Sequence, residues 1–223
     1  MLRALTTLAL LALPGTALAA DLVSEPPTDA RINMLTDPGW GFYVQGYGGV
    51  VTQTTATFIE TFSDGFPESF FDTLSHGPAF GASIGVTTPI DGLSVGIDVM
   101  HTHADFTDFA PDFPATLDTL SVMGTVEGAY HLTPQFDLYA SGGLGAMAVH
   151  YADPSVAVDG MAPAYQVAVG LRAKVTDNLS LFTEFKHQDV FMGANVGDPF
   201  DDDSTVTIAK ANNAVLAGLR FSY

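Results

Sequence analysis

Residues 165–175 read YQVAVGLRAKV, and the alternation in this stretch decides the fold. Apolar side chains occupy the odd-numbered positions, while Gln166, Gly170, Arg172 and Lys174 stand at even-numbered ones. Side chains of a β-strand point alternately to its two faces, so this segment has one apolar face and one charged face. Such a strand is typical of a membrane barrel, where the apolar face meets lipid and the polar face lines the interior.

The same period of two recurs along the chain before and after this stretch. Each alternating segment runs for about 12 residues, somewhat beyond its apolar face, which is enough to cross a bilayer as a tilted strand. We therefore expect eight strands. Their apolar faces lie within residues 42–50, 80–86, 93–99, 120–130, 138–148, 165–175, 179–185 and 215–223.

The connections between these segments are of two kinds. Short turns are expected near 89–92, 133–135 and 176–178, and long loops near 52–77, 105–118, 151–162 and 189–208. Membrane barrels have short turns in the periplasm and long loops outside the cell. The sequence thus predicts an all-β fold, an eight-stranded antiparallel transmembrane β-barrel that follows an up-and-down meander, with both ends in the periplasm.

The N-terminal segment has the layout of a secretory signal peptide. Arg3 precedes an apolar run over residues 4–13, and Ala17-Leu18-Ala19 supplies a small-residue cleavage pattern. The run is shorter than the ~20 residues of a spanning helix, so we expect cleavage rather than an uncleaved anchor. No later run reaches that length, and strands cross a bilayer only in a closed barrel. The predicted division is a signal peptide over 1–20, a flexible periplasmic lead-in over 21–39 and the barrel over 40–223.

Composition narrows the possible partners. The chain has 7 Lys and Arg against 25 Asp and Glu and a net charge of −18, so binding to nucleic acid is not expected. It has no cysteine and therefore no disulfide. The glycine-rich segment 142–145 is not followed by a helical pattern, so it is not interpreted as a nucleotide loop, and no cofactor is predicted.

Several charged residues stand at positions of the predicted strands whose side chains point into the barrel. The acids are Asp98, Glu127 and Glu184, and the basic residues are Arg172, Lys174, Lys186 and Arg220. Buried charges must be paired, so we predict ion pairs between these acids and Arg172, Lys186 and Arg220. The set forms either a structural polar core or the selectivity lining of a pore. Glycines on the same parity, among them Gly85 and Gly170, are expected to make room for the long charged side chains.

Three segments have a recognisable order and spacing: WGFYV at 40–44, LFTEFK at 181–186 and GLRFSY at 218–223. Through them, and over nearly its whole length after the signal, the chain resembles the small outer-membrane β-barrel family of opacity proteins, Omp25-like surface antigens and the OmpA membrane domain. The resemblance implies the outer membrane of a Gram-negative bacterium. It also implies that Leu219, Phe221 and Tyr223 form the C-terminal signal for the barrel-assembly machinery, although an interfacial aromatic girdle explains them too.

His101, His103 and Asp105 stand at alternate positions near the outer end of one predicted strand. Such a cluster suits acid–base catalysis or metal binding. In the alternation of this strand, however, their side chains point outward with the apolar ones. A polar belt at the level of the lipid headgroups is therefore the simpler interpretation.

The last long loop carries an acidic group made of Asp198, Asp201, Asp202 and Asp203. Carboxylates are ligands that Ca²⁺ prefers, but the spacing is not that of an EF-hand. A solvated acidic loop is therefore expected here, with a Ca²⁺ site at these four residues as the alternative.

Two functions remain open at this stage. The first is a non-enzymatic surface barrel that supports envelope integrity, presents loops to partners and has at most a narrow pore. Its partners would be outer-membrane lipids, lipopolysaccharide and the assembly machinery, and it would be a monomer. The second is an enzyme that modifies lipid A, with His101, His103 and Asp105 as the active residues.

Overall fold

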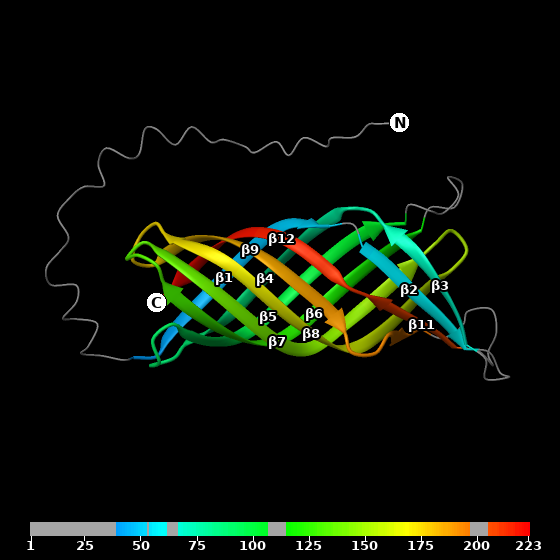
Figure 1. Ribbon diagram of the computed structural model, residues 1–223, viewed down its shortest axis with the longest axis horizontal. Helices are drawn as coiled ribbons and strands as arrows, with labels where there is room; N and C mark the ends of the chain where they lie inside the picture. The colour runs from blue at the N-terminus through cyan, green and yellow to red at the C-terminus, as the bar shows by residue number, and fades with distance from the viewer. Residues whose placement is uncertain (1–38, 53, 62–66, 107–114, 197–204) are drawn as a thin grey trace, which may run out of the picture. The chain divides into compact units, whose positions relative to one another are not determined.

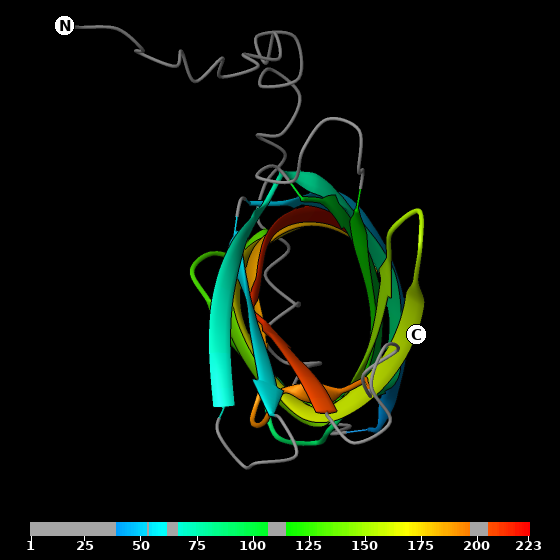
Figure 2. The same ribbon diagram turned by 90° about the vertical axis from the view of Figure 1, so that its right-hand side faces the viewer.

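A computed structural model describes residues 39–52, 54–61, 67–106, 115–196 and 205–223. Within these residues the chain forms a closed antiparallel barrel, which confirms the predicted fold class (Figures 1 and 2). The barrel closes because β1 pairs with both β4 and β12, and β9 pairs with both β8 and β12. Its eight strands are β1 (Gly41–Val51), β4 (Gly77–Thr87), β5 (Leu93–Asp105), β6 (Thr116–His131), β7 (Phe136–Ala152), β8 (Ala157–Lys174), β9 (Leu179–Val190) and β12 (Asn212–Ser222).

The alternation of β8 separates the two faces of the wall. Val167, Val169 and Leu171 are about half exposed on the outside, whereas Ala168 and Arg172 are 7% and 8% exposed on the inside. Neighbouring strands continue this pattern, and together they form an apolar belt around the barrel. In a bilayer that belt is covered by lipid.

The short turns at one end of the barrel are built from local hydrogen bonds. Thr133 Oγ1 accepts from the backbone N–H groups two and three residues later, at 3.2 and 3.1 Å. Thr176 Oγ1 does the same at 3.3 and 3.0 Å. Gly92 ends the turn before β5 at a φ of +73°, which favours glycine. These turns hold the register that sends each side chain to its correct face.

Two of the predicted long loops are wrong in part, because they contain further strands. These are β2 (Thr54–Thr61), β3 (Pro67–Leu74), β10 (Ala194–Asn195) and β11 (Thr205–Lys210). β2 pairs with β3 and β11, and β10 pairs with β11 and β8, so the wall continues beyond the eight-stranded ring. The alternation persists here too, since Ala56 and Phe58 are buried whereas Thr57 and Ile59 are partly exposed.

The predicted loop over 151–162 is also wrong, because β7 and β8 extend into it and leave a turn over 153–156. Asp153 Oδ1 accepts the backbone N–H groups of Ser155 and Val156 at 2.7 and 2.9 Å, and Oδ2 accepts the hydroxyl of Tyr151 at 2.9 Å. Burial alone would raise the pKa of Asp153, but these three donors hold it below its usual value. The charged carboxylate thus stabilises a tight hairpin.

The predicted signal peptide and nearly all of the predicted lead-in lie outside the described residues. In the part of the chain that is described, no helix has the length and apolar character needed to cross a membrane.

Candidate functional site

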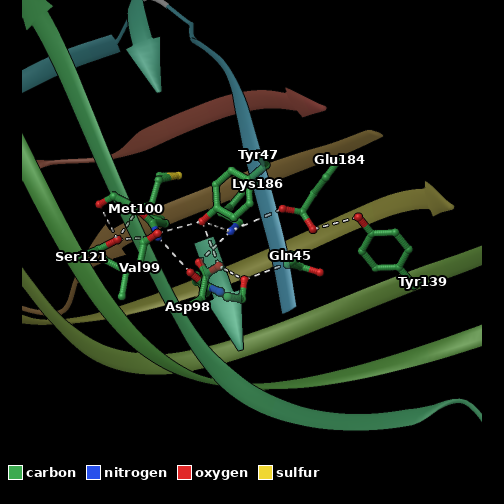
Figure 3. Close-up of polar contacts among 12 residues, drawn as sticks. Gln45, Tyr47, Asp98, Val99, Met100, Ser121, Tyr139, Glu184 and Lys186 are labelled. Atoms are coloured by element: carbon green, nitrogen blue, oxygen red, sulfur yellow. Dashed lines mark hydrogen bonds and ion pairs between the residues drawn. The ribbon is translucent and has the colours of Figure 1, made fainter. Parts of the chain in front are cut away.

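An ion-pair layer lies inside the barrel. Lys186 Nζ is 2.7 Å from Asp98 Oδ2 and 3.4 Å from Glu184 Oε1. Asp98 Oδ1 accepts the hydroxyls of Tyr47 and Ser83 at 2.9 and 2.6 Å. Figure 3 shows Lys186, Asp98 and Tyr47 pointing toward one another from β9, β5 and β1. Each charge of this layer thus has a charged partner, and Asp98 and Lys186 are also hydrogen-bonded, as burial requires.

A second cluster lies nearer the end of the barrel with the short turns. Glu127 Oε1 accepts hydrogen bonds from both Arg172 and Arg220, at 2.6 and 2.8 Å. Arg220 also donates to Ser94 Oγ at 3.2 Å. The two clusters contain all the residues of the predicted interior set except Lys174.

Lys174 is exposed at the mouth of the barrel, where its Nζ lies 3.8 Å from Asp137 Oδ1. Asp137 is buried and also bonds to His131 Nδ1 at 2.5 Å. Asp137 was missed at the sequence level. It stands next to a turn, on the inward parity of β7, so the same parity test would have identified it.

Three tyrosines lie under the interior cations, and sequence reasoning missed all of them. A ring below a cation stabilises it through the ring's electron-rich face. The pairs are Arg220 over Tyr43 at 3.7 Å, Lys186 over Tyr47 at 4.5 Å and Arg172 over Tyr139 at 4.8 Å from the ring centroid.

Gly85 and Gly170 make room for two of these rings rather than for charged side chains. A Cβ on Gly85 would lie 2.6 Å from the Tyr43 ring, and one on Gly170 would lie 2.5 Å from the Tyr139 ring. Both distances are too short for real atoms, so the tyrosine needs glycine on the adjacent strand. This corrects the expectation that glycine serves Lys and Arg directly.

A layer of neutral polar groups lies farther along the lumen, toward the end with the extension strands. Gln188 Nε2 donates to Ser121 Oγ and to Gln166 Oε1, both at 2.9 Å. Asn212 Nδ2 donates to Thr119 Oγ1 at 3.1 Å. All five side chains are buried, and they link four strands of the wall.

Beyond this polar layer the interior becomes apolar, which the sequence had not led us to expect. The outer face changes at the same height, where Asp118, His150 and Asp159 replace the apolar belt. A wall that has water outside must bury its apolar face inside. This part of the barrel therefore projects beyond the membrane. Its core includes Phe58, Leu74, Phe106, Leu117, Met147, Val149, Ala162 and Ile208.

Lys210 is buried at the boundary between the polar and apolar layers, at 2% exposure. Its Nζ has no hydrogen-bond partner among the described residues. β11, which carries it, lies beyond the apolar belt. Burial lowers the pKa of Lys210 to about 8, and among the described residues the charge of Asp118 opposes the shift.

The structure brings His101, His103 and Asp105 together on the outer face, and adds Asp118, which sequence reasoning missed. His103 Nδ1 lies 2.9 Å from Asp118 Oδ1, His101 Nε2 lies 3.5 Å from the same oxygen, and His103 Nε2 lies 3.6 Å from Asp105. Asp118 is the cross-strand neighbour of His103, which requires the β5–β6 register and cannot be read from either strand alone. Among the described residues no group of His, Asp and Glu is arranged to hold a metal ion.

Asp198, Asp201, Asp202 and Asp203 lie outside the described residues. The C-terminal Leu219, Phe221 and Tyr223 alternate on the outer face of the last strand and its end, with exposures of 44%, 44% and 77%. They therefore form part of the belt.

A closed barrel with an apolar belt and a charged interior is the architecture of outer-membrane β-barrels. No protein-family model matches the sequence, and no curated protein matches it. Among solved structures, the chain is similar to the outer membrane protein OprG from Pseudomonas aeruginosa, with 13% identity, a TM-score of 0.57, and coverage of 82% of this chain and 95% of that chain. It is also similar to a major outer membrane protein from Thermus thermophilus, with 11% identity, a TM-score of 0.50, and coverage of 83% and 100%.

These likenesses concern the fold. Together with the apolar outer belt, they show that the chain has the fold of the small outer-membrane β-barrel proteins, as the sequence predicted.

Proposed function

We propose that the protein is a non-enzymatic surface barrel that supports the envelope, presents acidic loops to the outside and has at most a narrow pore. The observation that carries this proposal is the filled interior. Asp98 and Lys186 join β5 to β9, and Glu127 and Arg220 join β6 to β12. In a ring of eight strands these are opposite walls, so each pair bridges the lumen.

The space left between the bridges supports a sealed lumen. The cavity among Tyr43, Asp98, Glu127 and Lys186 measures about 20 Å³. Roughly 10–15 Å³ of such volume holds one water molecule, so a hydrated ion does not fit. The apolar layer farther out adds a second barrier, because the described side chains that form it are apolar and cannot coordinate an ion.

The charge distribution supports lipid and lipopolysaccharide as surroundings rather than a basic docking surface. The described Lys and Arg residues all point into the lumen or stand at its mouth, while Asp105, Asp118 and Asp159 face outward. Divalent cations would bridge such carboxylates loosely to lipopolysaccharide phosphates. We further propose that the barrel is a monomer and meets the assembly machinery only during biogenesis.

Planar-bilayer recording of the purified protein tests the proposal. We expect no large, steady conductance. Gel mobility of the same sample before and after boiling shows whether the barrel was folded, because a folded barrel resists detergent. Large, steady conductance from a folded sample would overturn the sealed lumen.

One observation favours a second candidate, a lipid A-modifying enzyme. His103 is held by Asp118 at 2.9 Å on the outer face, and a carboxylate that orients a histidine is common in acid–base catalysis. Mass spectrometry of lipid A from cells with the wild type, the His103→Asn variant and no gene tests this function. Unchanged lipid A in all three would exclude it.

A further inference from the structure

The barrel has a cavity of about 270 Å³ at the mouth with the short turns. Glu127, Arg172, Arg220 and Ser94 line its inner part, and each is more than nine-tenths buried. Lys174 also lines it and is exposed. We call this cavity the vestibule. Short turns face the periplasm in outer-membrane barrels, so the vestibule would open on that side.

The floor of the vestibule has an excess of positive charge. Arg172 and Arg220 share one carboxylate, since both donate to Glu127 Oε1. Two guanidinium groups against one carboxylate leave a net charge of +1. This is the reverse of the acidic character of the whole chain.

The acids elsewhere in the vestibule do not cancel this charge at the floor. Asp137 is bound to His131 and lies near Lys174. Asp91 also binds His131, at 3.2 Å, and its side chain is 90% exposed. Asp177 is exposed in the turn before β9. Water screens exposed carboxylates more strongly than the buried arginine pair.

The arginine pair also has unused hydrogen-bond donors. A guanidinium carries five N–H groups. Within the described residues, Arg172 uses one for Glu127, and Arg220 uses one for Glu127 and one for Ser94. Arg220 Nε is buried and has no hydrogen-bond partner in the part of the chain that the structure describes. Planar, buried donors beside an open cavity match the oxygen atoms of a carboxylate or phosphate.

We propose that the vestibule binds a small oxyanion, a phosphate or a carboxylate, from the periplasm. The anion sits against the arginine pair and satisfies the free N–H groups, with the hydroxyl of Ser94 beside it. Lys174 at the mouth draws the anion in. The sealed lumen makes this a binding site rather than a step in permeation.

The test is phosphate rescue of a variant that loses the shared carboxylate. Glu127→Gln leaves both arginines without their anion, so inorganic phosphate is expected to raise its unfolding temperature by several degrees, and more than that of the wild type. Asp98→Asn is the matched control. It breaks an equally buried ion pair, but the cavity beside it is only about 20 Å³, so phosphate is expected to give no rescue.

Sodium acetate, sodium sulfate and sodium chloride at equal ionic strength complete the titration. A larger rise in the unfolding temperature of Glu127→Gln with phosphate or acetate than with chloride supports the site and identifies the preferred oxyanion. Equal stabilisation of both variants, or no effect beyond that of chloride, overturns the proposal.

A second measurement covers the case in which Glu127→Gln does not fold. The phosphorus NMR line of inorganic phosphate is expected to broaden in the presence of the folded wild type. The broadening should weaken at least two-fold in Lys174→Gln and remain in Lys210→Gln, since Lys210 lies at the far end of the lumen. Equal broadening in all three proteins, or none in the wild type, would refute the site.

Discussion

Lys186 Nζ on β9 lies 2.7 Å from Asp98 Oδ2 on β5, so the two residues form an ion pair that bridges opposite walls of the barrel (Figure 3). Both are almost completely buried, at 2% and 3% exposure. The pair combines attraction with hydrogen bonds from Tyr47 and Ser83, which offset part of the desolvation that burial imposes.

The two partners of this pair are expected to be energetically coupled. Asp98→Asn and Lys186→Met should each lower the free energy of unfolding by about 3 kcal/mol, because a buried charge is left behind. Glu184 lies 3.4 Å from Lys186 and still pairs with it in Asp98→Asn, so the loss of stability in that variant should not exceed this value. The double variant should lose clearly less than the sum of the two. Urea unfolding in micelles, followed by circular dichroism, measures all three, and additive losses would contradict the coupling.

The close contacts between inward glycines and tyrosine rings predict that alanine at such a glycine destabilises the barrel. Gly85→Ala places a methyl group against the Tyr43 ring and the neighbouring backbone, and should lower the free energy of unfolding by about 1–3 kcal/mol. Gly142→Ala is the control, since a Cβ there has open space on the outer face. Unfolding midpoints in urea that fall equally for both variants would show that the ring contact is not the cause.

Much of the fold follows from periodicity alone, because a strand exposes every second side chain to the same solvent. Arg172 and Val169 could be assigned to opposite faces from position alone, and the structure agrees. The extension strands β2 and β11 were not predicted. Their pairing depends on two segments about 150 residues apart, Thr57 meeting Ala209, and no local pattern specifies that contact.

The sequence predicted which charged residues point into the barrel, but not which acid pairs with which base. Parity identified Arg172, Lys186 and Arg220 as inward. Which acid each one meets depends on the stagger of the wall. The tyrosine rings beneath the cations, such as Tyr43 under Arg220, depend on the same stagger. The apolar layer was missed because it requires knowing where the membrane ends along each strand.

Lys210 supplies a prediction about pH. Its pKa in the folded protein is about 8, below the usual 10.5, so between these values the unfolded chain holds a proton that the folded chain has lost. Stability therefore rises with pH across this window, and below pH 8 the burial cost of roughly 3 kcal/mol is fully present. Lys210→Met should be more stable than the wild type at pH 7, and the gap should close toward pH 10.5. Urea titrations at several pH values measure the gap, and a constant gap would contradict the assignment.

Substitution of Tyr223 can distinguish a role of this residue in barrel assembly from a role in the stability of the folded barrel. The backbone of Tyr223 closes the sheet, since its N–H donates to Phe42 O at 2.8 Å and its carbonyl accepts from Phe42 N at 3.0 Å, while its side chain is 77% exposed. Tyr223→Ser keeps both backbone hydrogen bonds. The free energy of unfolding, measured after refolding in micelles, should therefore change by less than about 0.5 kcal/mol. If the side chain is part of the assembly signal, the amount of folded barrel in the outer membrane should fall several-fold. Tyr130→Ser is the matched control, because Tyr130 is an equally exposed aromatic at the same end of the barrel. An equal loss in both variants, measured by heat-modifiable mobility of membrane fractions, would mean that Tyr223 acts only as part of the interfacial girdle.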